Sequence, residues 1–537
     1  MDIVIALIAF LFGLCLIISL HELGHFMFAK KYNVLCYDYS IGMGPLIYGK
    51  KKGETLYGIR AIPLGGFVAM ADGAVANDLL EKDSEIGIKV NENNIITDII
   101  LTDQMPSDIR GKVVDRDVYC MEGNAPYIIL NIDGTETNYE VDIKANVYLK
   151  KDKPMQLAPY DRCFESKTKW QRFVMLFAGP GMNFILAIFL FIIAGLLVGK
   201  PSTKPIIGSM EETYKLDKVE YKYPAFEAGL KKGDQITKIN DKEVSKWNDI
   251  SIITDEIKST NTLTVEVTYV RDGIEATTTL RPMIVLGNIG VMGNLEEFSD
   301  ADGATIFIYT TKAQKAGLEN KDVITKIEYI DKKDSTKDAS WEIHSWSDLI
   351  GALTDESING KELKVTVNRA GEVKTLDVPT FSSSEVKKIK DLTLYGATIG
   401  VSPKYHFDFL YSFVYTFKSF GKSISSVWGT LGLLFTSKNV GVKDLSGPVG
   451  IFSLIKNSLA GGFANYIYFL GFLSVNIGIV NLLPIPALDG GRIVFVGIEA
   501  VTRKKVNKKV EDWLNNIVFF LLIGLFIYIT INDVLRL

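Results

Sequence analysis

The sequence predicts a polytopic α-helical membrane protein of about four transmembrane helices, with inserted soluble α+β domains and a β-rich insert. Hydrophobic residues make up 47% of the 537 residues and charged residues 23%, as in ordinary globular chains. The mean hydropathy of +0.17 is high for that mixture, which indicates apolar blocks separated by polar ones. The formal net charge of −4 argues against a nucleic-acid-binding protein. Four cysteines are too few for a disulfide scaffold.

Four long apolar runs predict the transmembrane helices. Each has at least 18 residues without a charged side chain; they are residues 3–20, 173–199, 457–488 and 514–532. Buried core helices are the alternative. The first run has no basic residue before it and continues into His21-Glu22, so we interpret it as a retained helix and not as a signal peptide. A weaker stretch, residues 407–435, suits an amphipathic or re-entrant element, although a full crossing stays open.

Basic residues beside the runs predict which loops are cytoplasmic. Lys and Arg residues cluster after the first run, before the second, and between the third and fourth, whereas few lie at the chain ends. By the positive-inside rule those loops face the cytoplasm, while both termini and the region from residue 200 to about 407 lie outside. Cys36, Cys120 and Cys163 then fall on the reducing side and Cys15 in a span, so we expect no disulfide.

Residues 72–166 predict a small β-rich insert on the cytoplasmic side. Strand-like runs flank Asp133-Gly134, a dipeptide typical of a hairpin turn. The sequence of this insert indicates no chemical role.

The outer region contains an internal repeat. Residues 228–239 (AGLKKGDQITKI) match residues 316–327 (AGLENKDVITKI), and each copy is followed by a tryptophan, a helical stretch and alternating strands. The pattern resembles the PDZ domain, which can bind an extended chain end by adding it to a sheet edge. The second copy has Lys321 in place of Gly233, and a β-sandwich spacer without a ligand stays an alternative for it.

The motif HELGH, residues 21–25 at the inner end of the first run, predicts a metal site. Residues four apart share a helix face, so His21 and His25 can bind one metal ion while Glu22 stands beside it. Polar residues inside a membrane are costly and usually functional. Histidines that are merely hydrogen-bonded inside a helix bundle are the alternative.

A third ligand is needed, because a catalytic zinc takes three protein ligands and keeps one position open. Asp489 is the candidate: it closes the third run, where two prolines break the helix at membrane depth. The predicted topology puts Asp489 on the same side as His25, whereas His344 and His406 are not placed to reach it. A solvated carboxylate at a helix end is the alternative for Asp489.

Together these features resemble the site-2 protease family, in particular its bacterial RseP-type branch, over nearly the whole chain. The matching motifs are HELGH at residues 21–25, IGMGP at 41–45, IPLGGFV at 62–68, FAGP at 177–180 with Asn183-Phe184, SGPVG at 446–450 and NLLPIPALDG at 481–490. The resemblance implies a Zn²⁺ ion held by His21, His25 and Asp489, with Glu22 as the general base.

The resemblance also implies how a substrate is held. A membrane-associated β loop is expected at Gly42 and Gly44, and Asn481 is expected to help bind the substrate backbone as an extended strand. The long insert, the degenerate second repeat, and Ala69 where the family usually has lysine set this chain apart and leave its substrate open. The insert suggests the Gram-positive side of the branch.

The activity that the resemblance implies is intramembrane proteolysis. We expect regulated cleavage of single-span membrane proteins after a first cut, with anti-sigma factors or remnant signal peptides as substrates. The outer PDZ-like domains would exclude bulky ectodomains. We expect a bacterial cell membrane protein whose active site faces the cytoplasm; its partners are these substrates, unidentified PDZ ligands and the lipid bilayer, and not nucleic acid.

Three other functions fit some of these features. One is a non-proteolytic membrane PDZ scaffold with a structural metal site, but such a site needs no base and Glu22 is present. A second is a metal transporter, which should show ligands along several spans rather than at one depth. A third is a membrane-anchored zinc protease that cuts soluble loops.

The predicted organisation follows the chain in seven segments. They are the first transmembrane helix with the β loop (1–71), the insert (72–166), the second transmembrane helix (167–200), the first PDZ-like domain (201–283), the second (284–381), a linker with the amphipathic segment (382–456), and the third and fourth transmembrane helices (457–537).

Overall fold

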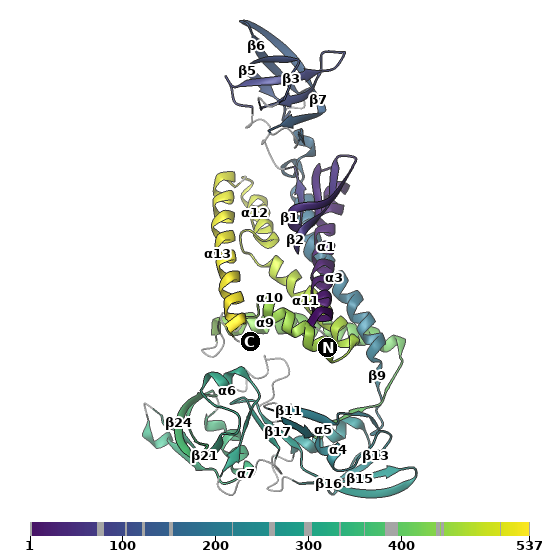
Figure 1. Cartoon of the computed structure of the whole chain (residues 1–537), viewed down its shortest axis with the longest axis vertical. Coiled ribbons are helices and arrows are strands. Elements are labelled where there is room, and N and C mark those ends of the chain that lie inside the picture. The colour runs from purple at the N-terminus through teal and green to yellow at the C-terminus, as the bar shows by residue number, and fades with distance from the viewer. Residues whose placement is uncertain are drawn as a thin grey trace. The chain divides into compact units, whose positions relative to one another are not determined.

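The computed structural model forms two compact units, Met1–Phe191 with Ser446–Leu537 and Ile192–Leu445. Figure 1 shows their elements. The structure describes residues 3–71, 80–102, 105–120, 124–149, 154–216, 219–256, 264–294, 303–331, 334–358, 360–381, 396–436, 441, 445–504 and 506–535.

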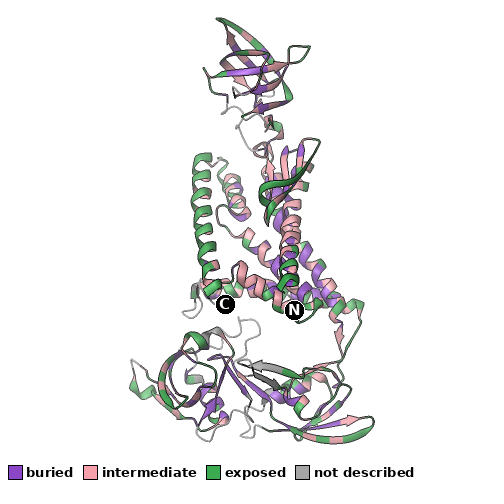
Figure 2. Ribbon diagram, viewed as in Figure 1, coloured by how far each residue is buried: buried purple, intermediate pink, exposed green. Residues whose placement is uncertain are grey.

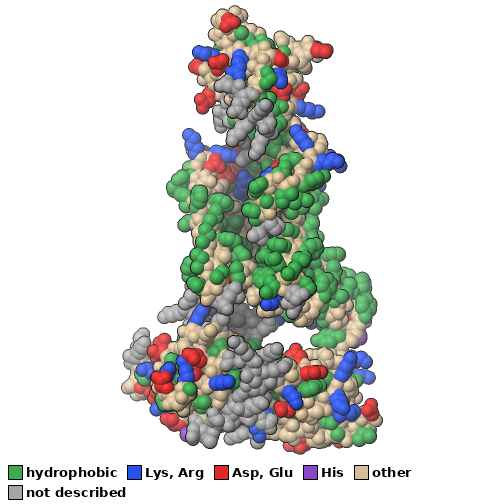
Figure 3. Space-filling view, in the orientation of Figure 1, with side chains coloured by type: hydrophobic (Ala, Val, Ile, Leu, Met, Phe, Trp, Pro, Cys, Tyr) green, Lys and Arg blue, Asp and Glu red, His purple; other side chains and the backbone are tan. Residues whose placement is uncertain are grey.

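The first unit is built on long helices. Among the described residues they are α1 (Ile3–Lys31), α3 (Lys169–Val198, which runs on into the second unit), α10 (Pro448–Ala460), α11 (Phe463–Leu482), α12 (Asp489–Thr502) and α13 (Lys508–Leu535). Of these, α1, α3, α11 and α13 are long and apolar enough to cross a membrane. Hydrophobic side chains cover much of the visible surface of this helical part (Figure 3). The expectation of about four spanning helices is confirmed in length and composition.

The third apolar run is not one continuous helix, which corrects the predicted span of residues 457–488. It contains the end of α10, a break at Gly461-Gly462, then α11 and a non-helical loop. Gly462 has a φ of 107°, which glycine adopts without strain. Pro484 and Pro486 lie beyond the end of α11, because proline cannot continue a helix. The candidate crossing is therefore Phe463–Leu482.

A long antiparallel hairpin of β1 (Cys36–Lys52) and β2 (Thr55–Met70) packs beside α1 (Figure 1). Both strands bend, so residues 38–41 pair on one side with residues 66–69 and on the other with residues 56–59. Several large apolar side chains of the hairpin are exposed: Met43, Leu46, Ile47, Tyr48, Ile59 and Ile62. Such a surface suits lipid better than water and supports the predicted membrane-associated loop.

The described part of the predicted insert is a small β barrel; residues 72–79 lie outside the described residues. Its strands are β3 (Glu85–Val90), β4 (Ile96–Ile100), β5 (Ile109–Asp117), β6 (Tyr127–Ile132), β7 (Thr135–Tyr148) and β8 (Pro154–Gln156), in the order β4-β3-β5-β6-β7-β8. β4 also pairs with β7, which closes the sheet. Asp133 and Gly134, with φ of 49° and 88°, form the predicted turn between β6 and β7. Two short 3₁₀ helices, Tyr160–Arg162 and Phe164–Ser166, precede α3.

The second unit contains the two predicted repeat copies, which share one topology. The first comprises α4 (Pro224–Glu227), β13 (Gln235–Ile239), β14 (Lys242–Glu243), α5 (Trp247–Glu256), β15 (Val265–Arg271) and β16 (Ile274–Leu280); the second comprises α6 (Thr311–Lys315), β21 (Val323–Tyr329), β22 (Ala339–Glu342), α7 (Trp346–Thr354), β23 (Glu362–Arg369) and β24 (Glu372–Pro379). The sheet orders correspond, β14-β13-β15-β16 in one copy and β22-β21-β23-β24 in the other. The internal repeat is thus a structural duplication.

The two copies also share an ion pair between a buried aspartate and a partly exposed arginine, which their sequences did not reveal. Arg271 donates from Nε and Nη2 to Asp234 at 2.7 Å, and Arg369 donates likewise to Asp322 at 2.7 and 2.8 Å. Each arginine also donates to a glycine carbonyl, that of Gly229 or Gly317. Asp234 is 1% exposed and Asp322 is fully buried, so each pair fastens a strand end to the repeat motif.

Among the residues that the structure describes, the remaining elements of the second unit are short strands, two 3₁₀ helices and one long helix. They are β9 (Lys200–Pro201), β10 (Ile207–Met210), β11 (Thr213–Leu216), β12 (Val219–Lys222), β17 (Met283–Leu286), β18 (Val291–Asn294), β19 (Ala304–Thr305), β20 (Phe307–Ile308), 3₁₀ helices at Ser335–Lys337 and Glu356–Ile358, β25 (Gly396–Thr398), β26 (Val401–Pro403), β27 (Tyr405–His406) and α9 (Phe409–Thr436). Helix α9 buries Ser412, Thr416, Ser419 and Ser423 but exposes large apolar side chains such as Phe413 (Figure 2). Such a helix fits the amphipathic element predicted at residues 407–435.

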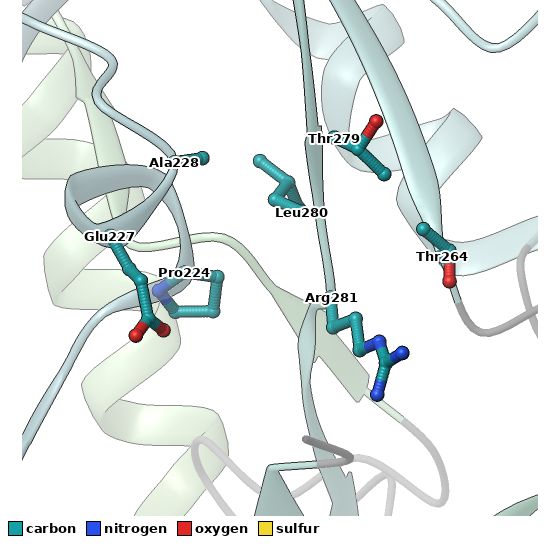
Figure 4. Close-up of a pocket in the computed structure, with 7 residues that line it drawn as sticks. All are labelled: Pro224, Glu227, Ala228, Thr264, Thr279, Leu280 and Arg281. Atoms are coloured by element: carbon teal, nitrogen blue, oxygen red, sulfur yellow. The ribbon is translucent and has the colours of Figure 1, made fainter. Parts of the chain in front are cut away.

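A cavity of about 410 Å³ lies in the first repeat copy (Figure 4). Its lining residues are Pro224, Glu227, Ala228, Thr264, Thr279, Leu280 and Arg281. None of them is a predicted site residue, so this cavity is separate from the predicted chemistry.

Candidate metal centre

Helix α1 places His21 and His25 on one face, one turn apart. Both histidines are buried, each with 7% exposure, and their Nε2 atoms lie 3.2 Å apart. The glycine between them is needed for packing: a Cβ on Gly24 would stand 2.3 Å from the carbonyl oxygen of Ala178 in α3. The two helix backbones are therefore in direct contact at the level of the histidines.

Asp489, the first residue of α12, brings a carboxylate to the two imidazoles. Its Oδ2 lies 3.2 Å from His21 Nε2 and 3.4 Å from His25 Nε2. One donor atom from each residue lies within 4.8 Å of the others, so the three can hold a metal ion. The structure thus brings together the three ligands predicted from residues far apart in the sequence.

Helix α3 supplies the room for an ion. A Cβ on Gly179 would lie 2.2 Å from His25 Nε2 and 2.8 Å from His21 Nε2, where those atoms face Asp489. Only a residue without a side chain leaves this space open. The donor set also fits zinc, which binds imidazole nitrogen and carboxylate oxygen in catalytic sites. The residues present therefore fit a zinc ion.

Backbone and side-chain groups of the same α3 face orient the imidazoles. His25 Nδ1 donates to the carbonyl oxygen of Met175 at 2.8 Å, which leaves Nε2 with a lone pair for a metal. His21 Nδ1 lies 3.2 Å from the side-chain amide nitrogen of Asn183. Met175, Gly179 and Asn183 are spaced four apart and so line one stripe of α3.

Asn183 is a further candidate for the site, which the sequence analysis named within a motif but gave no role. It is fully buried, and its Oδ1 has no hydrogen-bond partner in the structure. Amide nitrogen and oxygen are interchangeable assignments, since the group can be turned over. Turned over, Oδ1 would accept a bond from His21 Nδ1–H, which is the tautomer that frees Nε2 for a metal. The motif around Asn183 was visible in the sequence, but its role depends on packing between α1 and α3.

Glu22 stands beside the three ligands rather than among them. Its carboxylate accepts a backbone hydrogen bond from Val68 of β2, and it interacts electrostatically with His21, His25 and Asp489. A Cβ on Gly66 would lie 3.2 Å from Glu22 Cγ, so β2 passes close to this side chain. The predicted base is therefore held between α1 and the hairpin.

The other predicted site residues lie in the same unit. Gly42 and Gly44 sit in β1 with φ of 87° and 82°, and a Cβ on Gly42 would meet the carbonyl oxygen of Ile62 at 2.7 Å. Asn481 lies in the last turn of α11 and is partly buried.

Comparison with known proteins assigns the family. The model of peptidase family M50 matches residues 9–525. The zinc metalloprotease RasP of Oceanobacillus iheyensis is 29% identical over 535 residues, covering 99% of both chains. The regulator of sigma-W protease RasP of Bacillus subtilis is 28% identical over 538 residues, covering 99% of this chain and 98% of its own. With these matches and a three-ligand cluster on its helices, the chain belongs to peptidase family M50 and is a zinc metalloprotease.

Proposed function

We propose that this protein cleaves single-span membrane proteins within the membrane, as a step of regulated proteolysis that follows a first cut. One observation carries the proposal: His21 and His25 lie in α1, which is long and apolar enough to span a membrane, and both approach Asp489. A metal site built on such a helix suits substrates that are themselves in the membrane.

In this proposal His21, His25 and Asp489 are the zinc ligands, and Glu22 is the general base. When bound, zinc activates water and polarises the scissile carbonyl. Glu22 takes the proton of the attacking water and returns it to the leaving nitrogen. Its bond from the Val68 N–H holds the carboxylate beside the three clustered residues, and Glu22 is not a member of that cluster.

The hairpin is the proposed binding platform for the substrate. A helical substrate satisfies its own backbone hydrogen bonds, so it must unwind before its peptide bond can be attacked. A strand edge offers replacement partners for the freed groups. Gly42 and Gly44 let β1 bend within the exposed apolar hairpin, and Asn481 is proposed to bind the substrate backbone from α11.

The substrate class and the orientation are further parts of the proposal. The Bacillus subtilis relative is named for regulation of sigma-W, which supports membrane-bound anti-sigma factors as substrates; remnant signal peptides are a second class. The positive-inside pattern supports an active site toward the cytoplasm and repeat domains outside. The duplicated domains, which we propose are PDZ-like, would then admit only substrates that a first protease has trimmed.

The test compares the full-length chain in detergent with Glu22→Gln, using a tagged single-span substrate with and without a zinc chelator. We expect cleavage by the wild type alone, loss of cleavage in chelator, and about one zinc per chain in both proteins by mass spectrometry. Glu140→Gln, an exposed glutamate on β7, serves as the matched control and should cleave normally. Zinc in both proteins but cleavage in neither, across trimmed substrates, would favour a non-proteolytic PDZ scaffold.

A further inference from the structure

The loop between α11 and α12, residues 483–488, determines where Asp489 stands. Among its residues, Leu483, Ile485 and Leu488 donate their backbone N–H groups locally, to Val480, Leu483 and Ile485 respectively. Pro484 and Pro486 have no N–H to donate. The remaining N–H, that of Ala487, donates to Asn515 Oδ1 of α13 at 2.9 Å. Asn515 is thus the tertiary acceptor for the backbone N–H groups of this loop.

Ala487 has an unusual backbone conformation at the point where this bond forms. Its φ is 71°, in the left-handed region that a residue with a Cβ adopts only at a cost. Ala487 stands two residues before Asp489, so relaxation of its φ would move the carboxylate directly. The bond that the Ala487 N–H donates to Asn515 Oδ1 is formed in this strained conformation, and it can therefore offset the cost.

The start of α12 leaves the loop little freedom elsewhere. A Cβ on Gly490 would stand 2.2 Å from the Leu483 carbonyl oxygen, and one on Gly491 would stand 2.3 Å from that of Ile485. The loop backbone is therefore pressed against the first turn of α12. A shift of the loop backbone at Ala487 would therefore displace Asp489 as well.

We propose that Asn515 is a positioning residue, which holds Asp489 in reach of His21 and His25 by fixing the left-handed conformation of Ala487. The inference rests on the proposed ligand set of the previous section. Asn515 acts only through the loop, by keeping Asp489 close to the two histidines. Replacing Asn515 should therefore first weaken metal binding.

The experiment measures zinc affinity of the full-length chain in detergent by competition with a chromophoric chelator. Asn515→Leu should weaken binding about 10- to 100-fold, as lost outer-shell contacts typically do. Asn515→Asp keeps the acceptor and should bind zinc close to the wild type. Asn516→Leu, an exposed neighbour on the same helix, is the matched control and should not change affinity.

A second substitution separates positioning from general packing. Glycine adopts a positive φ without strain, so Ala487→Gly should recover much of the affinity in the Asn515→Leu background. Equal affinity for Asn515→Leu and Asn516→Leu, or no recovery with Ala487→Gly, would overturn the proposal. Should Asn515→Leu not fold, Asn515→Ser, which shortens the reach of the acceptor, replaces it. A wild-type chain that binds no zinc would instead overturn the ligand set itself.

Discussion

Gly179 shows how a residue without a side chain shapes the metal centre. The three ligands converge from α1 and α12, but the space between them exists only because α3 carries no Cβ at this point. We expect Gly179→Ala to lose zinc, because the added methyl group would stand 2.2 Å from His25 Nε2. The measurement is zinc content by mass spectrometry after gel filtration.

Gly181→Ala provides the control for that substitution. A Cβ there would meet only the ring of Phe177, at an ordinary 3.5 Å, so zinc content should not change. A Gly179→Ala protein that retains one zinc would mean that the histidines can move aside, and the close packing of α3 would then not define the site.

A second test at the scale of single residues asks whether Asn183 affects zinc affinity through its contact with His21. Asn183→Ala would leave His21 Nδ1–H buried without an acceptor, so zinc affinity should fall about 10- to 100-fold. Asn183→Asp has two oxygens, accepts the same bond and should bind zinc nearly as well as the wild type. Equal loss in both variants would indicate a packing role for Asn183 and no control of the His21 tautomer.

At the scale of elements, the tip of the β hairpin is clamped to the chain that follows the barrel. Glu54 accepts two bonds from Arg162, at 2.6 and 2.7 Å, and one from Lys30 at 3.2 Å. The bonds from Arg162, with help from Lys30, lower the pKa of the Glu54 carboxyl from its usual 4.5 to about 2. The clamp joins α1, the hairpin turn and the segment before α3, so it fixes the hairpin at its turn.

This clamp predicts a pH dependence of stability. Because the pKa of Glu54 is lower in the folded state, its stabilising contribution is complete above about pH 4.5 and is lost as the pH falls through 2. Arg162→Gln should therefore be less stable than the wild type at pH 6, and the difference should shrink toward pH 2. Thermal unfolding in detergent across this range measures it; a difference independent of pH would contradict the assignment.

The last helix, α13, is fastened mainly by polar contacts. Near its end, Asp533 Oδ2 accepts the N–H groups of Gly447 and Gly450, both at 2.8 Å, at the start of α10. Near its beginning, Asn515 binds the loop before Asp489. Most large apolar side chains between these points are exposed, as expected for a helix that faces lipid. A few polar bonds therefore fix the position of a helix that packs little against protein.

At the scale of the whole molecule, the metal ligands and the repeat domains belong to different compact units. Asp322→Ala should destabilise the second repeat copy by about 2 kcal/mol, since it removes two charge-assisted bonds of Arg369, which keeps its contacts with Glu319 and the Gly317 carbonyl. Zinc affinity should stay at the wild-type value. Hydrogen exchange of residues 303–381 and chelator competition measure the two effects, with exposed Glu362→Ala as the control. A parallel loss of zinc would show that the two units are energetically coupled.

The sequence singled out three residues that the structure brings together, because each lies in a pattern that is local. HELGH places two histidines by helix periodicity alone, and the proline-rich break marks Asp489. The positions of Gly179 and Asn183 beside the histidines could not be predicted in this way. They depend on how α3 packs against α1, and the residue spacing within one helix does not determine that packing. The break at Gly461-Gly462 was missed because it lies inside a run without a charged residue, which was interpreted as one span.

The repeat domains show the same limit. The matching AGLxxxDxITKI segments predicted two copies, and the tryptophans correctly marked the following helices. The partner of the motif's aspartate, Arg271 or Arg369, lies two strands later and became visible only when those strands paired. Local motifs thus located the domains, whereas the contacts that hold them depend on distant residues.

The order of the ligands along the chain has a consequence for biosynthesis. A ribosome makes His21 and His25 well over 400 residues before Asp489 and the proposed positioning residue Asn515. A nascent chain therefore carries the HELGH helix in the translocon before the proposed third ligand, Asp489, has been made. The protease should stay inactive during membrane insertion, and become active only when α12 and α13 have packed against the earlier helices.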